Sequence, residues 1–269
     1  PSHLSEALAE MLGLLVADGT VFLRGFRFVK GYRSAVERVA KHIYTMFGYS
    51  CAVHRANSGV WEVTVSSTQL AAWLLSIGGL NPHAKGIPRC IFRAPRSMQA
   101  AFLRGLFADG TPRVREGGKV LESVWWSAGG SAADPEQFSQ DVQTLLLRLG
   151  MISTRFRVVR ARETSWRVAI YGEHAARFRD LIDFVSVEKS AKLHQATQIP
   201  PETGALVPIP RGLLSTGYTY QNARHRGYVS RATAAGWSTG SNDLAHYCRE
   251  ALTWHHDRVA AIEVLPPGP

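Results

Sequence analysis

The sequence predicts a mixed α/β protein built from two similar αββαββα halves, and three observations support this. Two apolar helical stretches end in the same tetrapeptide, Ala-Asp-Gly-Thr, at Ala17–Thr20 and at Ala108–Thr111. Each copy is followed by the same order of extended and helical segments. Hydrophobic residues make up 45% of the 269 residues, which is enough for a packed core. A pseudo-twofold protein is therefore the economical interpretation.

In the first half, extended and helical segments alternate after the helix that ends at Asp18. Apolar periodicity identifies each segment, and glycine and Asn-Ser-Gly turn signals mark their ends. The predicted segments are an extended stretch over 20–30, a helix over 34–47, strands over 52–55 and 60–66, and a helix over 69–77.

The second half repeats this order with a longer first hairpin, whose tip falls at 116–118. The predicted segments are an extended stretch over 111–127, a helix over 135–149, strands over 153–160 and 165–171, and a helix over 173–184. Proline-rich sequence near residue 200 marks a linker, followed by a helix near 243–252 and a strand over 257–265. The predicted domains are 1–95, 96–200 and a C-terminal extension, 201–269.

Charge and cysteine content narrow the function classes. Lysine plus arginine number 31 against 21 acids, which gives a formal charge of +10. This excess is equally consistent with a polyanionic partner such as nucleic acid and with a solvated basic face. The three cysteines lack metal-ligand spacing, which argues against a disulfide scaffold or a zinc module and favours a reducing, cytoplasmic setting. No apolar run reaches the roughly 20 residues of a membrane span. The Pro1 start, without methionine or signal peptide, indicates an excised piece.

Small residues precede each repeated aspartate. Gly13 and Ala17 lie on one helix face, as do Gly105 and Ala108, so the two helices can pack closely and bring Asp18 and Asp109 together. Adjacent carboxylates are costly without a cation between them, and metal-assisted phosphoryl chemistry uses such pairs. Alternatively, each Asp-Gly is an ordinary helix-ending turn. The glycine-to-aspartate spacing is one residue shorter in the second copy, which predicts a shifted helix register.

The segments 11–19 and 102–110 resemble the paired signature of the LAGLIDADG homing endonucleases, and residues 4–200 resemble a single-chain, two-repeat member. The resemblance implies saddle-shaped antiparallel sheets that bind DNA and a site in which Asp18 and Asp109, with Gly19 and Gly110, hold Mg²⁺, with Mn²⁺ or Ca²⁺ as substitutes for binding. It also implies one active-site lysine per half: Lys85, and Lys189 with Lys192 as the alternative. An ammonium there can orient the nucleophile and offset developing charge.

Strands that lie in the major groove point every second side chain toward the bases. The candidate DNA-binding residues are Arg24, Arg27, Lys30, Arg33, His54 and Arg55 in the first half, and Arg113, Arg115, Lys119, Arg155, Arg157, Arg160, Arg162 and Arg167 in the second. Any one of them could instead contact phosphate or solvent. Because the halves are unequal, we expect a non-palindromic target.

The tail, 254–263, resembles the strand that leads from an intein endonuclease back to the splicing domain, whose nucleophile and terminal His-Asn are absent. The resemblance thus implies an intein-derived, monomeric enzyme that makes a double-strand break in a long, asymmetric DNA site by metal-dependent hydrolysis; an intron-encoded origin stays open. Tyr218, Tyr220, Arg224, Arg226 and Arg231 either extend the footprint or pack on the endonuclease. A non-cleaving DNA-binding regulator on the same fold and an RNA-binding intron maturase are the alternatives.

Overall fold

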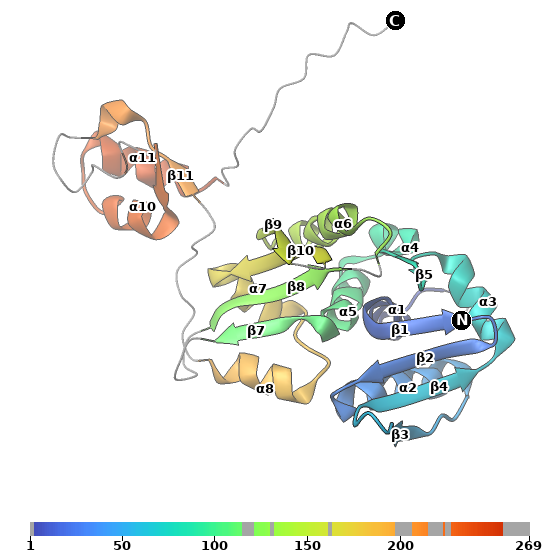
Figure 1. Ribbon diagram of the computed structural model, residues 1–269. Helices are drawn as coiled ribbons and strands as arrows, with labels where there is room; N and C mark the ends of the chain where they lie inside the picture. The colour runs from blue at the N-terminus through green and yellow to red at the C-terminus, as the bar shows by residue number, and fades with distance from the viewer. Residues whose placement is uncertain are drawn as a thin grey trace, which may run out of the picture. The chain divides into compact units, whose positions relative to one another are not determined.

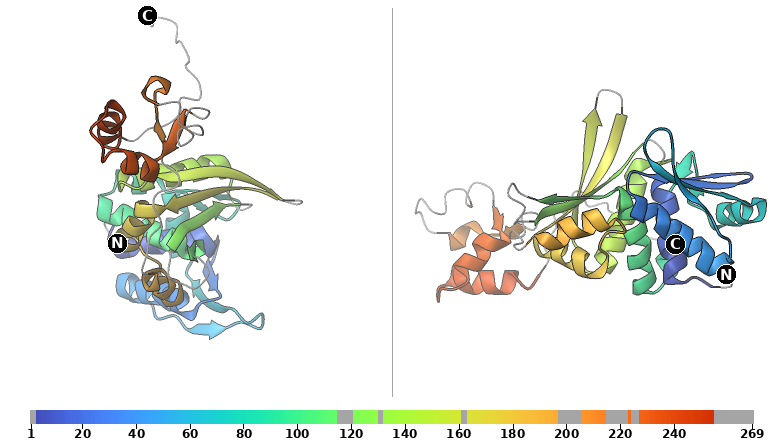
Figure 2. Two further views of the ribbon diagram at one scale, coloured as in Figure 1. Left: turned by 90° about the vertical axis from the view of Figure 1, so that its left-hand side faces the viewer. Right: turned by 90° about the horizontal axis from the view of Figure 1, so that it is seen from below.

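The computed structural model describes residues 3–114, 121–129, 132–160, 163–196, 206–214, 223 and 227–254. The chain divides into two compact units, Pro1–Pro200 and Pro201–Pro269. The first unit holds two four-stranded antiparallel sheets with helices α1 and α5 side by side between them (Figure 1). In Figure 2, right, both sheets lie on one side of this unit, and helices α1, α2 and α5 lie on the other.

The first repeat confirms the predicted order of helices and strands. Its elements are α1 (Glu6–Asp18), β1 (Gly19–Phe22), β2 (Gly25–Lys30), α2 (Arg33–Phe47), β3 (Val53–Arg55), β4 (Trp61–Ser66) and α3 (Thr68–Ile77). Gly48 ends α2 in the left-handed conformation, at φ 66°, which glycine adopts without steric cost. A short hairpin, β5 (Leu80–Asn81) and β6 (Ala84–Lys85), and helix α4 (Arg89–Arg93) follow; the sequence patterns did not predict them.

The second repeat has the same strand order as the first. Its elements are α5 (Arg96–Leu106), the 3₁₀ turn η1 (Phe107–Asp109), β7 (Thr111–Val114), β8 (Leu121–Ala128), α6 (Pro135–Arg148), β9 (Ser153–Arg160), β10 (Glu163–Tyr171), α7 (Gly172–Leu181) and α8 (Val187–Gln195). The sheets run β1-β2-β4-β3 and β7-β8-β10-β9, so the predicted αββαββα repeat is confirmed. The predicted hairpin tip at 116–118 lies outside the described residues.

One predicted helix was too long. The segment expected to be helical over 173–184 ends at Leu181, because Asp183 adopts a left-handed backbone at φ 58°. The Asp183 carboxylate accepts hydrogen bonds from the Phe184 amide, at 2.7 Å, and from the Ser190 hydroxyl, at 2.8 Å. Both bonds stabilise the break and fix the start of α8, the helix that carries Lys189.

The core of the first unit lies between the inner faces of the sheets and the helices. Helix α1 is buried along Leu8–Val16, as expected of a central helix that is apolar on nearly all sides. On β2 the alternating Phe26 and Phe28 are fully buried and point inward, whereas Arg27 between them is exposed. This alternation gives each sheet one packed face and one open face.

The second unit has a small core of its own. Strands β11 (Leu206–Pro208) and β12 (Tyr228–Ser230) pair. The 3₁₀ turn η2 (Arg211–Leu213) lies between them in the chain, and helices α10 (Arg231–Trp237) and α11 (Asp243–Ala251) follow β12. Val207, Ala234 and Cys248 are fully buried there. Helix α11 matches the helix predicted near 243–252, whereas the predicted strand over 257–265 and Tyr218, Tyr220, Arg224 and Arg226 lie outside the described residues. Among the helices that are described, none has the length and apolar character to cross a membrane.

Candidate functional site

Helices α1 and α5 cross at a pair of glycines. A Cβ atom built on Gly13 would lie 2.0 Å from the carbonyl oxygen of Phe102, and one built on Gly105 would lie 2.1 Å from that of Glu10. The two backbones are therefore in direct contact, which no side-chain-bearing residue would permit. The predicted close packing of the two repeated helices is present, and it is centred on these two residues.

The predicted shift of the second helix register is wrong, and the 3₁₀ turn η1 explains why. The last residues before Asp109 wind as a 3₁₀ helix, which rises about 2.0 Å per residue against about 1.5 Å in an α-helix. Five α-helical steps from Gly13 to Asp18 and four mixed steps from Gly105 to Asp109 both span about 7.5 Å along the axis. In ideal helix geometry the tighter winding offsets the missing residue, and both aspartates reach the same Lys30 ammonium.

The two aspartates converge on one ammonium group, that of Lys30. Lys30 Nζ forms ion pairs with Asp18 Oδ2 and with Asp109 Oδ1. The Lys30 side chain is only 11% exposed, while the aspartate side chains are 31% and 39% exposed. Lys30, which we predicted as a DNA-binding residue, shares the inner face of β2 with Phe26 and Phe28 and lies at the acids instead of on the open face of the sheet.

Two further lysines flank the acids, one from each repeat. Lys85 Nζ donates to the carbonyl oxygen of Ala17 at 3.2 Å, and Lys189 Nζ donates to those of Ala108 and Gly110 at 2.6 and 2.7 Å. Burial lowers the pKa of Lys85, and burial together with the nearby Lys30 charge lowers the pKa of Lys189 to about 8.

These contacts favour Lys189 over the alternative Lys192, which lies exposed on α8. Each of the two predicted active-site lysines reaches the backbone at the end of the acidic helix of its own repeat. The lysine positions therefore follow the pseudo-twofold arrangement of the acids.

The donor set fits a hard divalent cation. In the described part of the chain no three His, Cys, Asp or Glu side chains cluster as a metal site would require. Mg²⁺, however, is often held by only one or two carboxylates, with water and substrate phosphate completing its octahedron. Asp18 and Asp109 provide such a carboxylate pair, and both already face one positive charge. Of the predicted glycine ligands, Gly110 directs its carbonyl to Lys189, and Gly19 begins β1 opposite Phe28.

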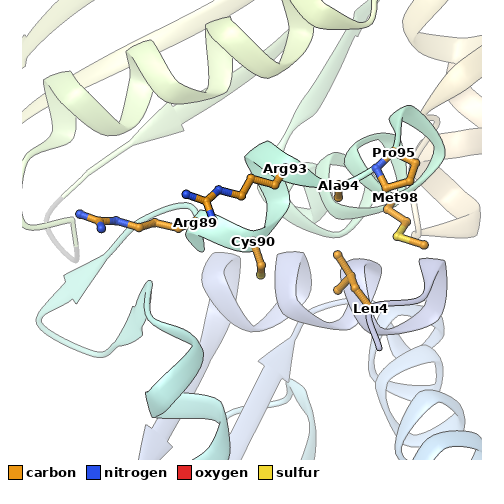
Figure 3. A pocket seen from close by; sticks show the side chains of 7 residues that line it. All are labelled: Leu4, Arg89, Cys90, Arg93, Ala94, Pro95 and Met98. Carbon is orange, nitrogen blue, oxygen red and sulfur yellow. The ribbon is translucent and has the colours of Figure 1, made fainter. Parts of the chain in front are cut away.

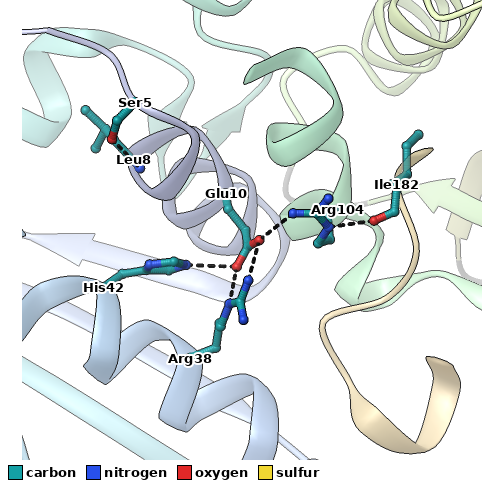
Figure 4. Close-up of polar contacts among 7 residues, drawn as sticks. All are labelled: Ser5, Leu8, Glu10, Arg38, His42, Arg104 and Ile182. Carbon is teal, nitrogen blue, oxygen red and sulfur yellow. Dashed lines mark hydrogen bonds and ion pairs between the residues drawn. The ribbon is translucent and has the colours of Figure 1, made fainter. Parts of the chain in front are cut away.

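A buried ion cluster joins the two repeats behind the acids (Figure 4). The Glu10 carboxylate, 2% exposed, accepts hydrogen bonds from Arg38 at 2.6 and 3.1 Å and from Arg104 at 3.1 Å, and it contacts His42 at 2.8 Å. Burial alone would raise the pKa of Glu10, but the hydrogen bonds from His42 and Arg38 outweigh it and lower the pKa to about 2. Arg104 also donates to the carbonyl of Ile182 at 2.6 Å, so the cluster links α1, α2, α5 and the segment after α7.

The open face of the first sheet is polar and contains an acid that the sequence patterns did not single out. Glu62 on β4 forms an ion pair with Arg27 and contacts His54 Nε2 at 2.9 Å. The hydrogen bond from Arg27 lowers the pKa of Glu62. Two predicted DNA contacts are thus held by one carboxylate, and the alternation of β4, where Val63 and Val65 are buried, could have revealed that Glu62 faces outward.

Other predicted residues of the first repeat lie at the margins of this face. Arg24 is exposed in the turn between β1 and β2. Arg33 pairs with Glu37 at 2.7 Å, and its guanidinium lies 4.9 Å from the centre of the Trp61 ring. Arg55 Nε donates to the carbonyl of Gly59 at 3.1 Å in the β3–β4 turn.

The open face of the second sheet carries a stack of arginine and aromatic side chains. The guanidinium groups of Arg113 and Arg167 lie 4.6 and 4.4 Å from the centre of the Trp125 ring. Arg167 also lies 5.8 Å from the centre of the Phe156 ring. Such contacts hold arginines in a fixed orientation. Trp125 was not among the predicted residues, although Val124 and Trp126 are buried and alternation therefore turns Trp125 outward.

Arg155, which we predicted to face the bases, lies on the other face of the sheet. Arg155 pairs across the sheet with the buried Val168, so it lies on the helix-covered face, where it contacts Glu136 of α6 at 3.3 Å and the Trp166 ring at 4.4 Å. Arg157 shares this face and is exposed. Arg160 ends β9, and three predicted residues lie outside the described ranges: Arg115, Lys119 and Arg162.

A surface cavity of about 580 Å³ lies at the start of α1 and along α4 and α5 (Figure 3). Its lining consists of Leu4, Arg89, Cys90, Arg93, Ala94, Pro95 and Met98. Burial raises the pKa of the Cys90 thiol, which makes it a poorer nucleophile than a free cysteine. Its lining residues include no carboxylate.

Sequence comparisons point to one domain family. A family model described as a LAGLIDADG-like domain matches residues 97–183. The replicative DNA helicase DnaB of Rhodothermus marinus is 34% identical over 208 residues, which cover 71% of this chain and 22% of the helicase. The DNA polymerase of Thermococcus hydrothermalis is 26% identical over 203 residues, which cover 70% of this chain and 12% of the polymerase. The chain therefore spans less than a quarter of either relative.

Solved structures with a similar fold include two homing endonucleases. I-WcaI bound to its DNA recognition sequence superposes with a TM-score of 0.52 at 12% identity, over 72% of this chain and 88% of that one. I-DmoI in complex with DNA and Ca superposes with a TM-score of 0.50 at 14% identity, over 70% and 97% of the two chains. At these identities the likeness establishes the fold alone.

Proposed function

Because this chain contains a LAGLIDADG domain and carries the homing-endonuclease fold, we propose that it is a site-specific DNA endonuclease. It hydrolyses one phosphodiester in each strand of a long, asymmetric duplex site in the presence of a divalent metal. The observation that supports this best is the convergence of Asp18 and Asp109, from separate repeats, on a single point of positive charge.

The residues around this point have complementary tasks. Asp18 and Asp109 supply oxygen ligands for Mg²⁺, which when bound lowers the pKa of a coordinated water and stabilises charge on the phosphate. Lys85 and Lys189 hold the backbone carbonyls at the helix ends and place an ammonium on each side of the acids. Each ammonium can offset the charge that develops on one scissile phosphate.

The open sheet faces provide the DNA contacts. Arg113 and Arg167 are fixed on Trp125, and Arg27 is fixed on Glu62, so these side chains meet the duplex with little further loss of rotamer freedom. The two faces differ: one pairs basic side chains with an acid, and the other stacks them on aromatic rings. We therefore expect the two faces to bind two different half-sites, which makes the target asymmetric.

Two alternatives make different use of the same fold. A non-cleaving DNA-binding regulator would not need a carboxylate at the end of each central helix, and both are present here. An RNA-binding maturase is favoured only by the net charge of +10.

An intein origin fits the sequence matches. A helicase and a polymerase are unrelated enzymes, and this chain matches only 22% and 12% of their lengths. A segment shared by such proteins is expected of a mobile insertion, and its target would be the uninterrupted host gene.

The test is a cleavage selection from a random duplex library in which each strand is end-labelled. The selection is run once in the presence of Mg²⁺ and once in the presence of EDTA. We expect one long asymmetric site, cut in both strands by the unaltered chain only with metal. Asp18→Asn and Asp109→Asn abolish the double-strand break, while the matched control Asp180→Asn, at an exposed position on α7, cuts normally. Salt-sensitive DNA retention without cleavage in Mg²⁺ or Mn²⁺ would leave the regulator as the better description.

A further inference from the structure

The inner face of β2 delivers Lys30 to the acids. Phe26 and Phe28 are buried, and Lys30, two residues further on, ends the strand on the same face. Its ammonium touches both carboxylates, and its side chain is nearly buried. Burial of an ammonium group costs free energy unless anionic partners replace the lost water. Asp18 and Asp109 are these partners.

The same carboxylate oxygens are the proposed metal ligands, so one ammonium and one divalent ion compete for them. We propose that Lys30 is the internal counter-ion of the two acids in the DNA-free protein and that divalent metal binds only as Lys30 leaves them. This rests on the proposed function, since it assumes that the acids hold the metal.

The charges around the acids explain how this competition would couple metal binding to DNA. Among the described residues at the site, Lys30, Lys85 and Lys189 outnumber Asp18 and Asp109. A divalent ion added to this site meets a surplus of positive charge, because the lysines are too close for salt to screen them. DNA supplies phosphates, which attract the displaced Lys30 ammonium and complete the metal ligands. Lys30 therefore keeps metal affinity low until substrate is present.

The experiment measures Ca²⁺ binding to the DNA-free chain by isothermal titration calorimetry. Lys30→Met removes the competitor, and we expect it to bind Ca²⁺ at least tenfold more tightly than the unaltered chain. Lys30→Arg keeps the charge and should bind as weakly as the unaltered chain. Lys41→Met removes an exposed lysine of α2 and controls for net charge. Addition of a duplex that carries the selected target site should raise Ca²⁺ affinity strongly in the unaltered chain and only slightly in Lys30→Met.

A second readout shows whether Lys30→Met folds. Without metal, the two acids of Lys30→Met repel each other, so the melting temperature of this variant should be lower than that of the unaltered chain. Ca²⁺ should raise the melting temperature of Lys30→Met more than that of the unaltered chain. Equal Ca²⁺ affinity in Lys30→Met and the unaltered chain, with cleavage by the unaltered chain intact, would overturn the counter-ion role alone. Absence of Ca²⁺ binding in every variant, with and without DNA, would overturn both this inference and the proposed metal-dependent function.

Discussion

Gly13 and Gly105 hold the two repeats together by backbone contact. A Cβ on either residue would come within about 2 Å of a carbonyl oxygen on the opposite helix. The distance between the two helix axes, and with it the distance between the aspartates at their ends, therefore depends on the absence of two methyl groups.

Replacement of either glycine by alanine should force α1 and α5 apart. We expect Gly13→Ala and Gly105→Ala each to lower the free energy of unfolding by about 3 kcal/mol, at the upper end of overpacking effects because the obstacle is backbone. Urea denaturation followed by circular dichroism measures this. Gly86→Ala is the matched control, since a Cβ there meets no atom within 4 Å, and its stability should stay within about 0.5 kcal/mol.

The buried Glu10 cluster should make stability depend on acid pH. The pKa of Glu10 is about 2 in the folded protein against 4.5 as its ordinary value, so its contribution is complete at neutral pH and is lost as pH falls from about 5.5 to below 2. We expect Glu10→Gln to cost a few kcal/mol at pH 7 and much less at pH 3, measured by urea denaturation at both values. Glu37→Gln, on an exposed i,i+4 pair, should change stability little at either pH. An equal loss at both pH values would show that the charge of Glu10 is not what stabilises the cluster.

The Arg113–Trp125–Arg167 stack should contribute to DNA affinity in two distinguishable ways. Arg167→Ala removes a charge and should lower DNA affinity. If Arg167 contacts a phosphate, the slope of log affinity against log salt concentration should also become shallower by about one unit. Trp125→Ala leaves the charges in place but frees both arginines, so affinity should fall while the slope stays unchanged. Fluorescence anisotropy between 50 and 200 mM salt separates the two. Arg179→Ala, on α7, should bind as the unaltered chain does; an equal loss there would point to net charge alone.

Glu62 should act against non-specific binding. Its carboxylate neutralises Arg27 and repels phosphate, so Glu62→Gln should bind random duplex several-fold more tightly at low salt. Competition between a selected target and random DNA measures the accompanying loss of discrimination. Glu173→Gln removes the same charge from an exposed helix position and should have a smaller effect. Unchanged random-duplex affinity in Glu62→Gln would contradict this role.

Much of the fold and the centre of the site could be predicted from local pattern. The duplicated Ala-Asp-Gly-Thr segments located both aspartates, and strand and helix periodicity located the helices and strands of each αββαββα unit, although not β5, β6, α4, η1 or α8. These signals are local, because each depends only on residues a few positions apart. The paired lysines required a resemblance, since Lys85 lies on the two-residue strand β6 and the sequence patterns did not predict α8, which carries Lys189.

What depends on strand register or winding could not be predicted. The sequence shows that Arg155 and Arg157 share a face, but only pairing with Val168 shows that it is the helix-covered one. Lys30 appeared to be another basic strand residue, although its alternation with Phe26 and Phe28 does point it inward. The apolar pattern does not mark the 3₁₀ turn that ends at Asp109. The number of residues between glycine and aspartate therefore predicted a shifted register for the second helix.

That turn has a consequence for anyone who would recombine the two halves. In ideal helix geometry the two segments from crossing glycine to aspartate span about the same axial distance, although the second has one residue fewer. A chimera that transplants the Gly105–Asp109 segment into the first repeat keeps its acid in place only if the tighter winding travels with the segment. Motif grafts between halves should therefore be aligned on the carboxylate and the glycine in space, and the sequence between them should be allowed to differ in length.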